Sequence, residues 1–339
     1  MNPVAKSPRQ MLSNEEAGLP ARGIAGNRAC ATFAIWRNVG TNTRGVVIAV
    51  GNQKGGVGKT TNTVHLAAAL GHGGYRCLII DLDPAAGATR HLGIPENKFA
   101  GTLELLTMRE SIGQLMVDDE LPHGVHLIPS RPQLSELDAA LSKFSDRTRL
   151  LEQPLAEVRD RFDFIFLDTA PFAGATTTVA AYAAAEWILL SAFPHPLSLG
   201  GLTEAFRDIS DVRRHRNASL EILGVVFSNV DGRATRLRAE LETAAAMALP
   251  GRQFETHISQ AVVIPEASGR GRTVFQAPGY LRLPVAQQYL RLAAEIEHRV
   301  RHRDLFLQGK LPELADGLLS VPRGIRQVDS GEANSSPEE

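Results

Sequence analysis

Six short runs of almost continuous apolar residues recur along the middle of the chain. They cover residues 45–50 (GVVIAV), 76–81 (RCLIID), 124–129 (GVHLIP), 162–168 (FDFIFLD), 187–193 (WILLSAF) and 222–229 (ILGVVFSN). Apolar residues at consecutive rather than alternate positions are typical of strands that are buried on both faces of a parallel sheet. The six runs therefore predict a parallel sheet in the interior of the molecule.

Stretches with helical periodicity lie between these runs, for example at residues 61–72, 134–144, 177–186 and 201–215. A strand, a helix and a further parallel strand are joined by a right-handed crossover. The alternation predicts an α/β fold with a mostly parallel, doubly wound sheet flanked by helices. We assign it to one domain, roughly residues 45–307, and find no internal repeat.

The two ends of the chain show no such pattern. Residues 1–44 have no sustained periodicity and carry six Lys or Arg against two Glu. We expect a disordered arm there, and a short segment that docks on a partner or on DNA is the alternative. Residues 308–339 become polar and acidic, with little to bury, and are expected to be a mostly disordered tail.

Composition narrows the class of protein. The formal net charge of the 339 residues is −1, so an anionic partner must be held by a local basic patch. The two cysteines, Cys30 and Cys77, lie far apart, which argues against a disulfide framework or a cysteine-bound metal cluster. No apolar run approaches the ~18 residues of a membrane span, and no signal-peptide pattern is present. We therefore expect a cytoplasmic protein.

A glycine-rich segment, GNQKGGVGKTTNTVHLAAAL (residues 51–70), joins the first predicted strand to a helix. Gly55, Gly56 and Gly58 allow main-chain N–H groups to turn inward around phosphate oxygens. The following helix directs its positive end at the same anion. In a loop of this kind Lys59 reaches the β- and γ-phosphates, and the Thr60 hydroxyl binds Mg²⁺.

The segment departs from the general phosphate-loop pattern G-x-x-x-x-G-K-[ST] at its first position. Gln53 stands where that pattern has its first glycine, and Lys54 follows it. The segment KGGVGKTT resembles the deviant Walker A motif of the ParA/MinD family of ATPases. The resemblance implies that Lys54 crosses a dimer interface to the phosphates of the other subunit, so that ATP binding is converted into dimerisation.

Two further segments resemble motifs of that family. Residues 77–94 (CLIIDLDPAAGATRHLGI) resemble the motif D-L-D-P-Q-G-N-A-T, with Ala85 in place of its glutamine. By this resemblance Asp83 orients or deprotonates the attacking water, and Asp81 supports the Mg²⁺ shell. Residues 162–171 (FDFIFLDTAP) resemble the Walker B strand, in which Asp168 holds a Mg²⁺-bound water beside Thr60.

The resemblance covers roughly residues 45–307 and implies a set of functional residues. The segment 220–241 resembles the strand and loop near the adenine, where Asn229 is expected to contact the base. Catalysis is assigned to Lys54 and Asp83, and Mg²⁺ binding to Thr60, Asp81 and Asp168. The residues assigned to ATP are Lys54, Gly55, Gly56, Val57, Gly58, Lys59, Thr60, Thr61 and Asn229.

Several features favour the ParA or Soj-like branch of the family. Gln53 is usual in that branch, whereas MinD-like and iron–sulfur-carrier members usually have glycine there. A MinD-like protein would also need a basic amphipathic C-terminal helix for membrane binding, and this chain ends in SGEANSSPEE. No CxxC motif supports the carrier branch, and no tyrosine cluster at the end of the chain supports the tyrosine-kinase branch. No membrane partner is therefore expected.

DNA binding rests on fewer matching residues. Arg233 occupies a position where the family carries a DNA-binding arginine, whereas Val263 occupies the position of a second one. Arg270 and Arg272 are candidates to replace that second arginine. The segment HRVRHR (298–303) is another candidate, unless it is simply the solvated face of a helix.

These observations predict a ParA-type ATPase that uses ATP and Mg²⁺ and forms a homodimer when ATP is bound. Slow hydrolysis would be stimulated by a ParB-like partner, and non-specific DNA binding would place the protein on the nucleoid to drive plasmid or chromosome partitioning. A positioning or regulatory ATPase for a non-DNA cargo, such as a chemoreceptor cluster, an organelle or a secretion complex, is the alternative. A metabolic enzyme with a phosphate loop is the third class.

Overall fold

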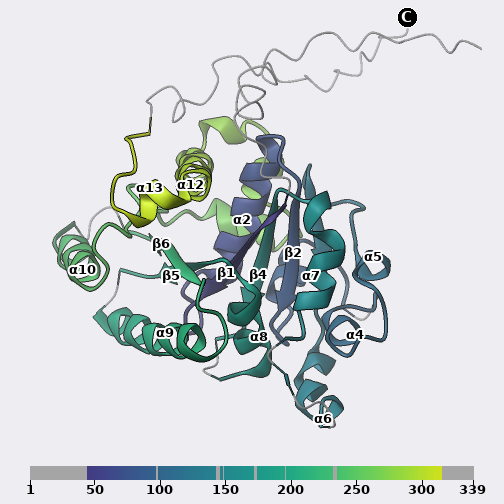
Figure 1. Ribbon diagram of the computed structural model, residues 1–339. Coiled ribbons are helices and arrows are strands. Elements are labelled where there is room, and N and C mark those ends of the chain that lie inside the picture. The colour runs from purple at the N-terminus through teal and green to yellow at the C-terminus, as the bar shows by residue number, and fades with distance from the viewer. Residues whose placement is uncertain are drawn as a thin grey trace, which may run out of the picture.

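A six-stranded parallel sheet forms the centre of the molecule (Figure 1). The computed structural model describes residues 44–96, 98–142, 146–147, 149–171, 174–194, 196–231 and 235–314. The strands are β1 (Val46–Gly51), β2 (Cys77–Leu82), β3 (Val125–Ile128), β4 (Phe164–Thr169), β5 (Trp187–Ala192) and β6 (Glu221–Phe227). Their order is β3-β2-β4-β1-β5-β6, and each neighbouring pair is parallel. All six predicted strands and the predicted fold class are confirmed.

Helices cover both faces of this sheet (Figure 1). One face is covered by α2 (Lys59–His72), α3 (Gly87–His91), α12 (Pro284–Arg301) and α13 (Arg303–Leu307). The other face is covered by α4 (Thr102–Leu106), α5 (Ile112–Leu115), α6 (Leu137–Ala140), α7 (Glu152–Val158), α8 (Thr176–Ala184), α9 (Pro196–His215) and α10 (Thr235–Ala248). The remaining short helices are α11 (Val263–Ser268) and the 3₁₀ turns η2 (Pro132–Glu136), η3 (Arg159–Arg161), η4 (Val274–Gln276) and η5 (Tyr280–Arg282).

The alternation of side chains along each strand explains why the strands are apolar throughout. In β1, Val47 and Ala49 pack into the core under α8 and α9, whereas Val46, Ile48 and Val50 pack into the core under α2 and α12. Successive side chains of a strand point to opposite faces, so a sheet covered on both sides needs apolar residues at every position. Two cores, one on each face, hold the carboxyl ends of β1, β2 and β4 at one edge.

The segment 134–144, expected to be one helix, is shorter and divided. It begins inside the 3₁₀ turn η2 and continues as α6 only to Ala140. Ser135 Oγ donates a hydrogen bond to the carbonyl of Pro132 at 2.7 Å, a local bond that favours the tight turn. Residues 143–145 lie outside the described part of the chain.

The expected flanking segments fall largely outside the described residues. Residues 1–43 of the N-terminal arm and residues 315–339 of the C-terminal tail lie outside the described residues. Of the expected tail, residues 308–314 are described, and Leu311 packs against the apolar core under α12. His298, at the end of α12, is in hydrogen-bond contact with the carbonyl of Pro312 at 2.8 Å. The chain thus continues along the molecule for several residues beyond 307.

Candidate nucleotide site

The glycine-rich loop lies between β1 and α2, as the sequence predicts. Gly56 and Gly58 have φ values of 73° and 89°, in the left-handed region that glycine adopts without strain. Gly58 directly precedes α2, and its carbonyl accepts the first helical hydrogen bond from Asn62 N at 2.8 Å. Gly55 and Gly56 are exposed, whereas Val57 is buried and anchors the loop. The result is a helix N-terminus beneath an exposed glycine turn.

Lys59 is buried at the start of α2, between the loop and two carboxylates. Its Nζ donates a hydrogen bond to the carbonyl of Lys54 at 3.2 Å. Burial lowers the pKa of Lys59, and the negative charges of Asp168 and Asp83 act in the opposite direction. A buried cation beside a helix N-terminus is a complement for an anionic ligand.

Asp168, at the end of β4, lies against the first turn of α2. Its Oδ2 accepts a hydrogen bond from Thr60 Oγ1 at 2.8 Å, and its Oδ1 accepts one from Thr63 Oγ1 at 3.1 Å. Burial, and then the neighbouring Asp81 carboxylate, raise the pKa of Asp168. A hydroxyl and a carboxylate in direct contact are the oxygen donors that Mg²⁺ prefers, so the residues present fit that ion.

Asp81 pairs in register with Asp168 across β2 and β4, but its carboxylate has different partners. Oδ2 accepts hydrogen bonds from Thr89 N at 2.9 Å and Thr89 Oγ1 at 2.7 Å, and Oδ1 accepts one from Asp83 N at 3.2 Å. Burial raises the pKa of Asp81, and these bonds act against it. Asp81 therefore organises the loop that follows β2.

Asp83 is half-buried on that loop. Its Oδ1 accepts a hydrogen bond from Ala85 N at 2.8 Å, and its carbonyl accepts one from Ser130 Oγ at 2.7 Å. Ser130 N in turn donates to Thr89 Oγ1 at 2.8 Å. The loop after β2 is thereby tied to the residues that follow β3, which fixes the position of the Asp83 main chain.

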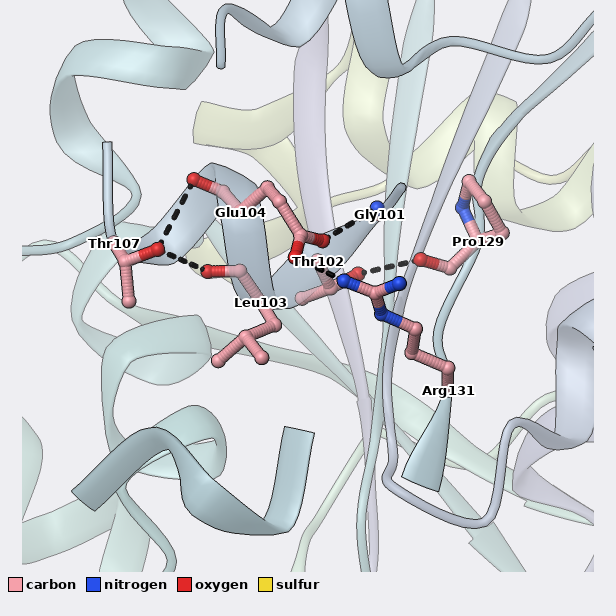
Figure 2. Close-up of polar contacts among 7 residues, drawn as sticks. All are labelled: Gly101, Thr102, Leu103, Glu104, Thr107, Pro129 and Arg131. Carbon is pink, nitrogen blue, oxygen red and sulfur yellow. Dashed lines mark hydrogen bonds and ion pairs between the residues drawn. The ribbon is translucent and has the colours of Figure 1, made fainter. Parts of the chain in front are cut away.

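A second set of contacts ties the start of α4 to the same edge (Figure 2). Thr102 Oγ1 donates to the carbonyls of Asp81 at 2.6 Å and Pro129 at 3.2 Å. Glu104 accepts a hydrogen bond from Gly101 N at 2.9 Å and forms an ion pair with Arg131. The carboxyl ends of β2 and β3 are thus joined through α4, which supports the loop that carries Asp83.

A cavity of about 500 Å³ opens beside the glycine loop, with two walls of different character. The first, which we call the loop wall, consists of Gly55, Gly56, Gly58, Lys59, Thr60, Thr61 and Asp83. The second, which we call the apolar wall, consists of Phe193, Ile258, Ala261, Ile264 and Pro265. Pro171, His91, Ser228, Asn229, Ser259, Ser268 and Tyr289 complete the lining. A mostly apolar cavity with a few polar groups is typical of a small-molecule site.

A buried polar network includes two residues of the cavity lining, Ser228 and Tyr289. Asn62, in α2, donates to Ser191 Oγ at 3.0 Å and Ser228 Oγ at 2.9 Å, and accepts a hydrogen bond from Tyr289 at 3.0 Å. It connects the ends of β5 and β6 to α2 and α12. Asn229 follows Ser228 with φ of 55°, a left-handed conformation that asparagine tolerates better than most residues.

Two histidines lie beside this network. His65 is fully buried and stacks on Tyr289 with ring centroids 4.8 Å apart, and His91 meets His65 edge-on at 5.1 Å. Burial lowers the pKa of His65 to about 3 and that of His91 to about 4. Both imidazoles are therefore neutral near pH 7, and His91 adds an uncharged polar group to the cavity lining.

The remaining predicted residues lie apart from the cavity. Lys54 is half-buried on the loop and does not line the cavity. Arg270 and Arg272 are exposed just beyond α11, near the half-buried Val263, and Arg233 lies outside the described residues. In the segment 298–303, Arg299 is buried and donates to the carbonyl of Leu223 at 2.8 Å. The hypothesis that this whole segment is a DNA-binding or solvated face is therefore wrong for Arg299, because the core needs its guanidinium.

Motif spacing did not reveal the apolar wall. Phe193 ends the predicted strand 187–193, and the other four residues come from the chain before and within α11. No local pattern assigned any of the five to a cavity. His91 was also missed, although it lies at the end of the 77–94 segment. A parallel sheet gathers the segments after its strands at one edge, and this was the signal available for Phe193.

Two features are absent from the described residues. No cluster of three or more His, Cys, Asp or Glu side chains is placed to hold a metal ion. No helix in this part of the chain combines the length and the apolar character of a membrane span. The oxygen donors around Thr60 and Asp168 suit a metal only together with ligands from a bound phosphate.

The strand–loop–helix geometry, with a Lys-Thr pair at the helix start and a carboxylate at the end of a parallel strand, defines the P-loop NTPase fold. Residues 45–222 match the family model described as an AAA domain. The chromosome-partitioning ATPase Soj of Thermus thermophilus is 34% identical over 255 residues, which are 75% of this chain and 96% of Soj. The chromosome partitioning protein ParA of Caulobacter vibrioides is 32% identical over 260 residues, 76% of this chain and 96% of ParA.

A solved structure agrees with these relatives. Cobyrinic acid a,c-diamide synthase from Mycobacterium smegmatis, with bound ADP and magnesium, superposes with a TM-score of 0.62 at 27% identity, and covers 80% of this chain and 99% of the synthase. The chain belongs to the ParA/MinD family of P-loop ATPases, as its deviant Walker A segment predicts.

Proposed function

We propose that this protein is a ParA-type ATPase whose ATP-bound homodimer binds DNA non-specifically and drives plasmid or chromosome partitioning with a ParB-like partner. One observation carries the proposal. The loop presents two lysines in different surroundings, with Lys59 buried in the cavity wall and Lys54 half-buried outside the cavity lining. A single subunit's nucleotide needs only the first. The similarity to Soj and ParA supports a partitioning role.

The nucleotide is ATP, held with its phosphates on the loop wall and its base against the apolar wall. Lys59 would leave the carbonyl of Lys54 for the β- and γ-phosphates, and the N–H groups of residues 55–61 would surround them. Asn229 would contact the base. Mg²⁺, when bound, supplies charge neutralisation at the phosphates. Thr60 and Asp168 would hold it, and Asp81 would fix the loop beside it.

Lys54 converts ATP binding into dimerisation. Two triphosphates brought face to face place many negative charges close together, and a lysine from each subunit offsets that repulsion. The dimer would therefore persist only while the γ-phosphate is present. Lys54 lies on the loop outside the cavity lining, and this position supports a contact with a second copy of the chain.

Hydrolysis is assigned to Asp83, which lines the cavity on a loop tied to Ser130. Its carboxylate would orient a water, or accept its proton, as the water oxygen bonds to the γ-phosphorus and the bond to the β-phosphate oxygen breaks. ADP and phosphate result, and the dimer separates. Turnover is expected to be slow until a ParB-like partner stimulates it. The protein would act in the cytoplasm, on the nucleoid.

A salt titration of DNA binding tests the partitioning role. The Asp83→Ala protein with ATP should bind a labelled duplex of any sequence, and the affinity should fall steeply with salt. Each phosphate contact contributes roughly −0.9 to the slope of log affinity against log salt. Arg233→Ala should flatten the slope by about two, one contact per subunit, and Arg270→Ala with Arg272→Ala should flatten it further. Fluorescence anisotropy measures both.

The DNA titration and an assay of ATP turnover distinguish two other functions from this one. A dimer that ignores DNA even at low salt favours a positioning ATPase for a non-DNA cargo, as the Val263 substitution at the second arginine position would suggest. The similarity to a diamide synthase favours a third class, in which the phosphate loop serves ligation or phosphoryl transfer. ATP turnover that requires a small-molecule acceptor, and is unchanged by DNA and a partner protein, would identify that class.

A further inference from the structure

The first part of the glycine loop, residues 51–54, is anchored residue by residue. A Cβ at Gly51 would lie 2.2 Å from the Tyr182 hydroxyl, so α8 packs directly against the main chain there. Asn52 is buried, donates to the carbonyl of Ser191 at 2.7 Å and accepts a hydrogen bond from Lys54 N at 2.9 Å. Neighbouring elements therefore determine where the chain enters the loop.

Gln53 has its own anchor on α9. Its Nε2 donates to Asp208 Oδ2 at 2.5 Å, a side-chain contact between residues 155 positions apart. Both residues are half-buried. Burial, and then the charge of Asp208, raise the pKa of Tyr182 in α8. α8 and α9 pack against each other on the same face of the sheet (Figure 1).

Gly55 and Gly56, the next two residues, are exposed, and the buried Val57 follows them. A Cβ at Gly56 would meet nothing within 4 Å, and one at Gly55 would meet only Pro171 at 4.0 Å. Lys54 therefore stands at the boundary between an anchored and an open part of the loop. The contact that immediately precedes it is the Gln53–Asp208 hydrogen bond.

We propose that Asp208 is a positioning residue for Lys54. By holding the side chain of Gln53, it fixes the main chain from which the Lys54 side chain extends, and it links α9 to the lysine that reaches the second subunit. A hydrogen bond to a carboxylate contributes more than one between neutral groups. The inference rests on the proposed function in one respect, the role of Lys54 across the dimer.

The test measures dimerisation and ATP affinity separately, in the Asp83→Ala background. Asp208→Ala removes the acceptor, and Gln53→Glu places two carboxylates together. Each should weaken the ATP-dependent dimer about tenfold, the worth of one charge-assisted hydrogen bond, and change ATP affinity less than about threefold. The pair Gln53→Glu with Asp208→Asn reverses donor and acceptor, and should restore dimerisation to within about threefold. Sedimentation velocity and calorimetry give the two quantities.

The matched control is Asp211→Ala, which removes an exposed carboxylate of α9 that pairs with His215 and Arg216. It should dimerise like the parent. The inference is overturned if Asp208→Ala also dimerises like the parent, if the reversed pair stays as weak as the single variants, or if ATP affinity falls together with dimerisation. Lys54→Ala separates the two claims. If that variant still dimerises normally, the proposed role of Lys54 fails, whereas normal dimerisation of Asp208→Ala alone overturns only the role of Asp208.

Discussion

The two walls of the cavity offer a ligand different kinds of interaction. The loop wall carries a buried lysine, and two buried carboxylates with raised pKa values lie behind it. The apolar wall consists of Phe193 and aliphatic side chains. The buried charges of the loop wall cost free energy until a ligand of opposite charge neutralises them. The apolar wall gains free energy from contact with the apolar surface of any flat ligand. From this comparison we expect the loop wall to determine which ligand binds and how it reacts, and the apolar wall to add affinity.

The largest effect is expected from the loop wall's cation. Lys59→Ala should lower ATP affinity at least about a hundredfold, because two charge-assisted contacts to the phosphates are lost. Isothermal calorimetry measures it, with Lys310→Ala, an exposed lysine near the end of the described chain, as the control. Unchanged affinity in Lys59→Ala would rule out the assigned phosphate position.

The second prediction separates chemistry from binding on the same wall. Asp83→Ala should lower ATP turnover about a hundredfold or more, because the water loses its orienting carboxylate, and should leave ATP affinity within about threefold. Phosphate release and calorimetry measure the two. Asp119→Ala, at an exposed carboxylate outside the cavity, should leave both unchanged. Persistent turnover in Asp83→Ala would show that another group activates the water.

The third prediction concerns the energetic cost of the loop wall without ligand. Burial raises the pKa of Asp168, so the folded state binds a proton more tightly than the unfolded state. Its contribution to stability is present below the ordinary carboxyl range and is lost as pH rises through the raised pKa. Asp168→Asn should therefore gain stability relative to the parent as pH rises from about 5 to about 8, by about 1 to 3 kcal/mol.

Chemical denaturation of the nucleotide-free protein at both pH values measures this difference. The buried histidines act in the opposite direction below pH 6.5, but they are present in both proteins and cancel. A difference between Asp168→Asn and the parent that does not change with pH would mean that the carboxyl titrates normally. If Asp168→Asn instead lost stability relative to the parent as pH rises, the sign of the account would be reversed.

The smallest effect is expected from the apolar wall. Phe193→Ala removes an aromatic face but no charge, so ATP affinity should fall about three- to tenfold and turnover at saturating ATP should not change. Phe99→Ala, at an exposed phenylalanine outside the cavity, is the matched control. A loss of turnover as large as that of Asp83→Ala would remove the distinction between the walls.

The same contrast explains what the sequence could predict. The loop wall comes from two continuous segments. Local spacing singled out Lys59 and Thr60, the family resemblance singled out Asp83, and all three line the cavity. The resemblance of its segment predicted that Asn229 contacts the base, and in the structure Asn229 lines the cavity. The apolar wall escaped prediction because Ile258 and Pro265, like its other members, meet only after the sheet has gathered their segments.

Side-chain networks were equally hidden. Asn62 lies within the predicted helix, but nothing in the local pattern shows that Ser191, Ser228 and Tyr289 converge on it. Arg299 illustrates the opposite error. A run of basic residues suggests a solvated face, and only tertiary packing shows that this guanidinium stacks on Phe254 with its carbon 3.9 Å from the ring centroid.

The central claim is that ATP brings two copies of the chain together through Lys54. Sedimentation velocity of Asp83→Ala, with Mg²⁺ and either ATP or ADP, tests it most directly, and Lys54→Ala in the same background is the comparison. The account predicts a dimer with ATP, a monomer with ADP, and a monomer in both nucleotides once Lys54 is replaced. A protein that stays monomeric with ATP, or a dimer that forms equally well without Lys54, would contradict it.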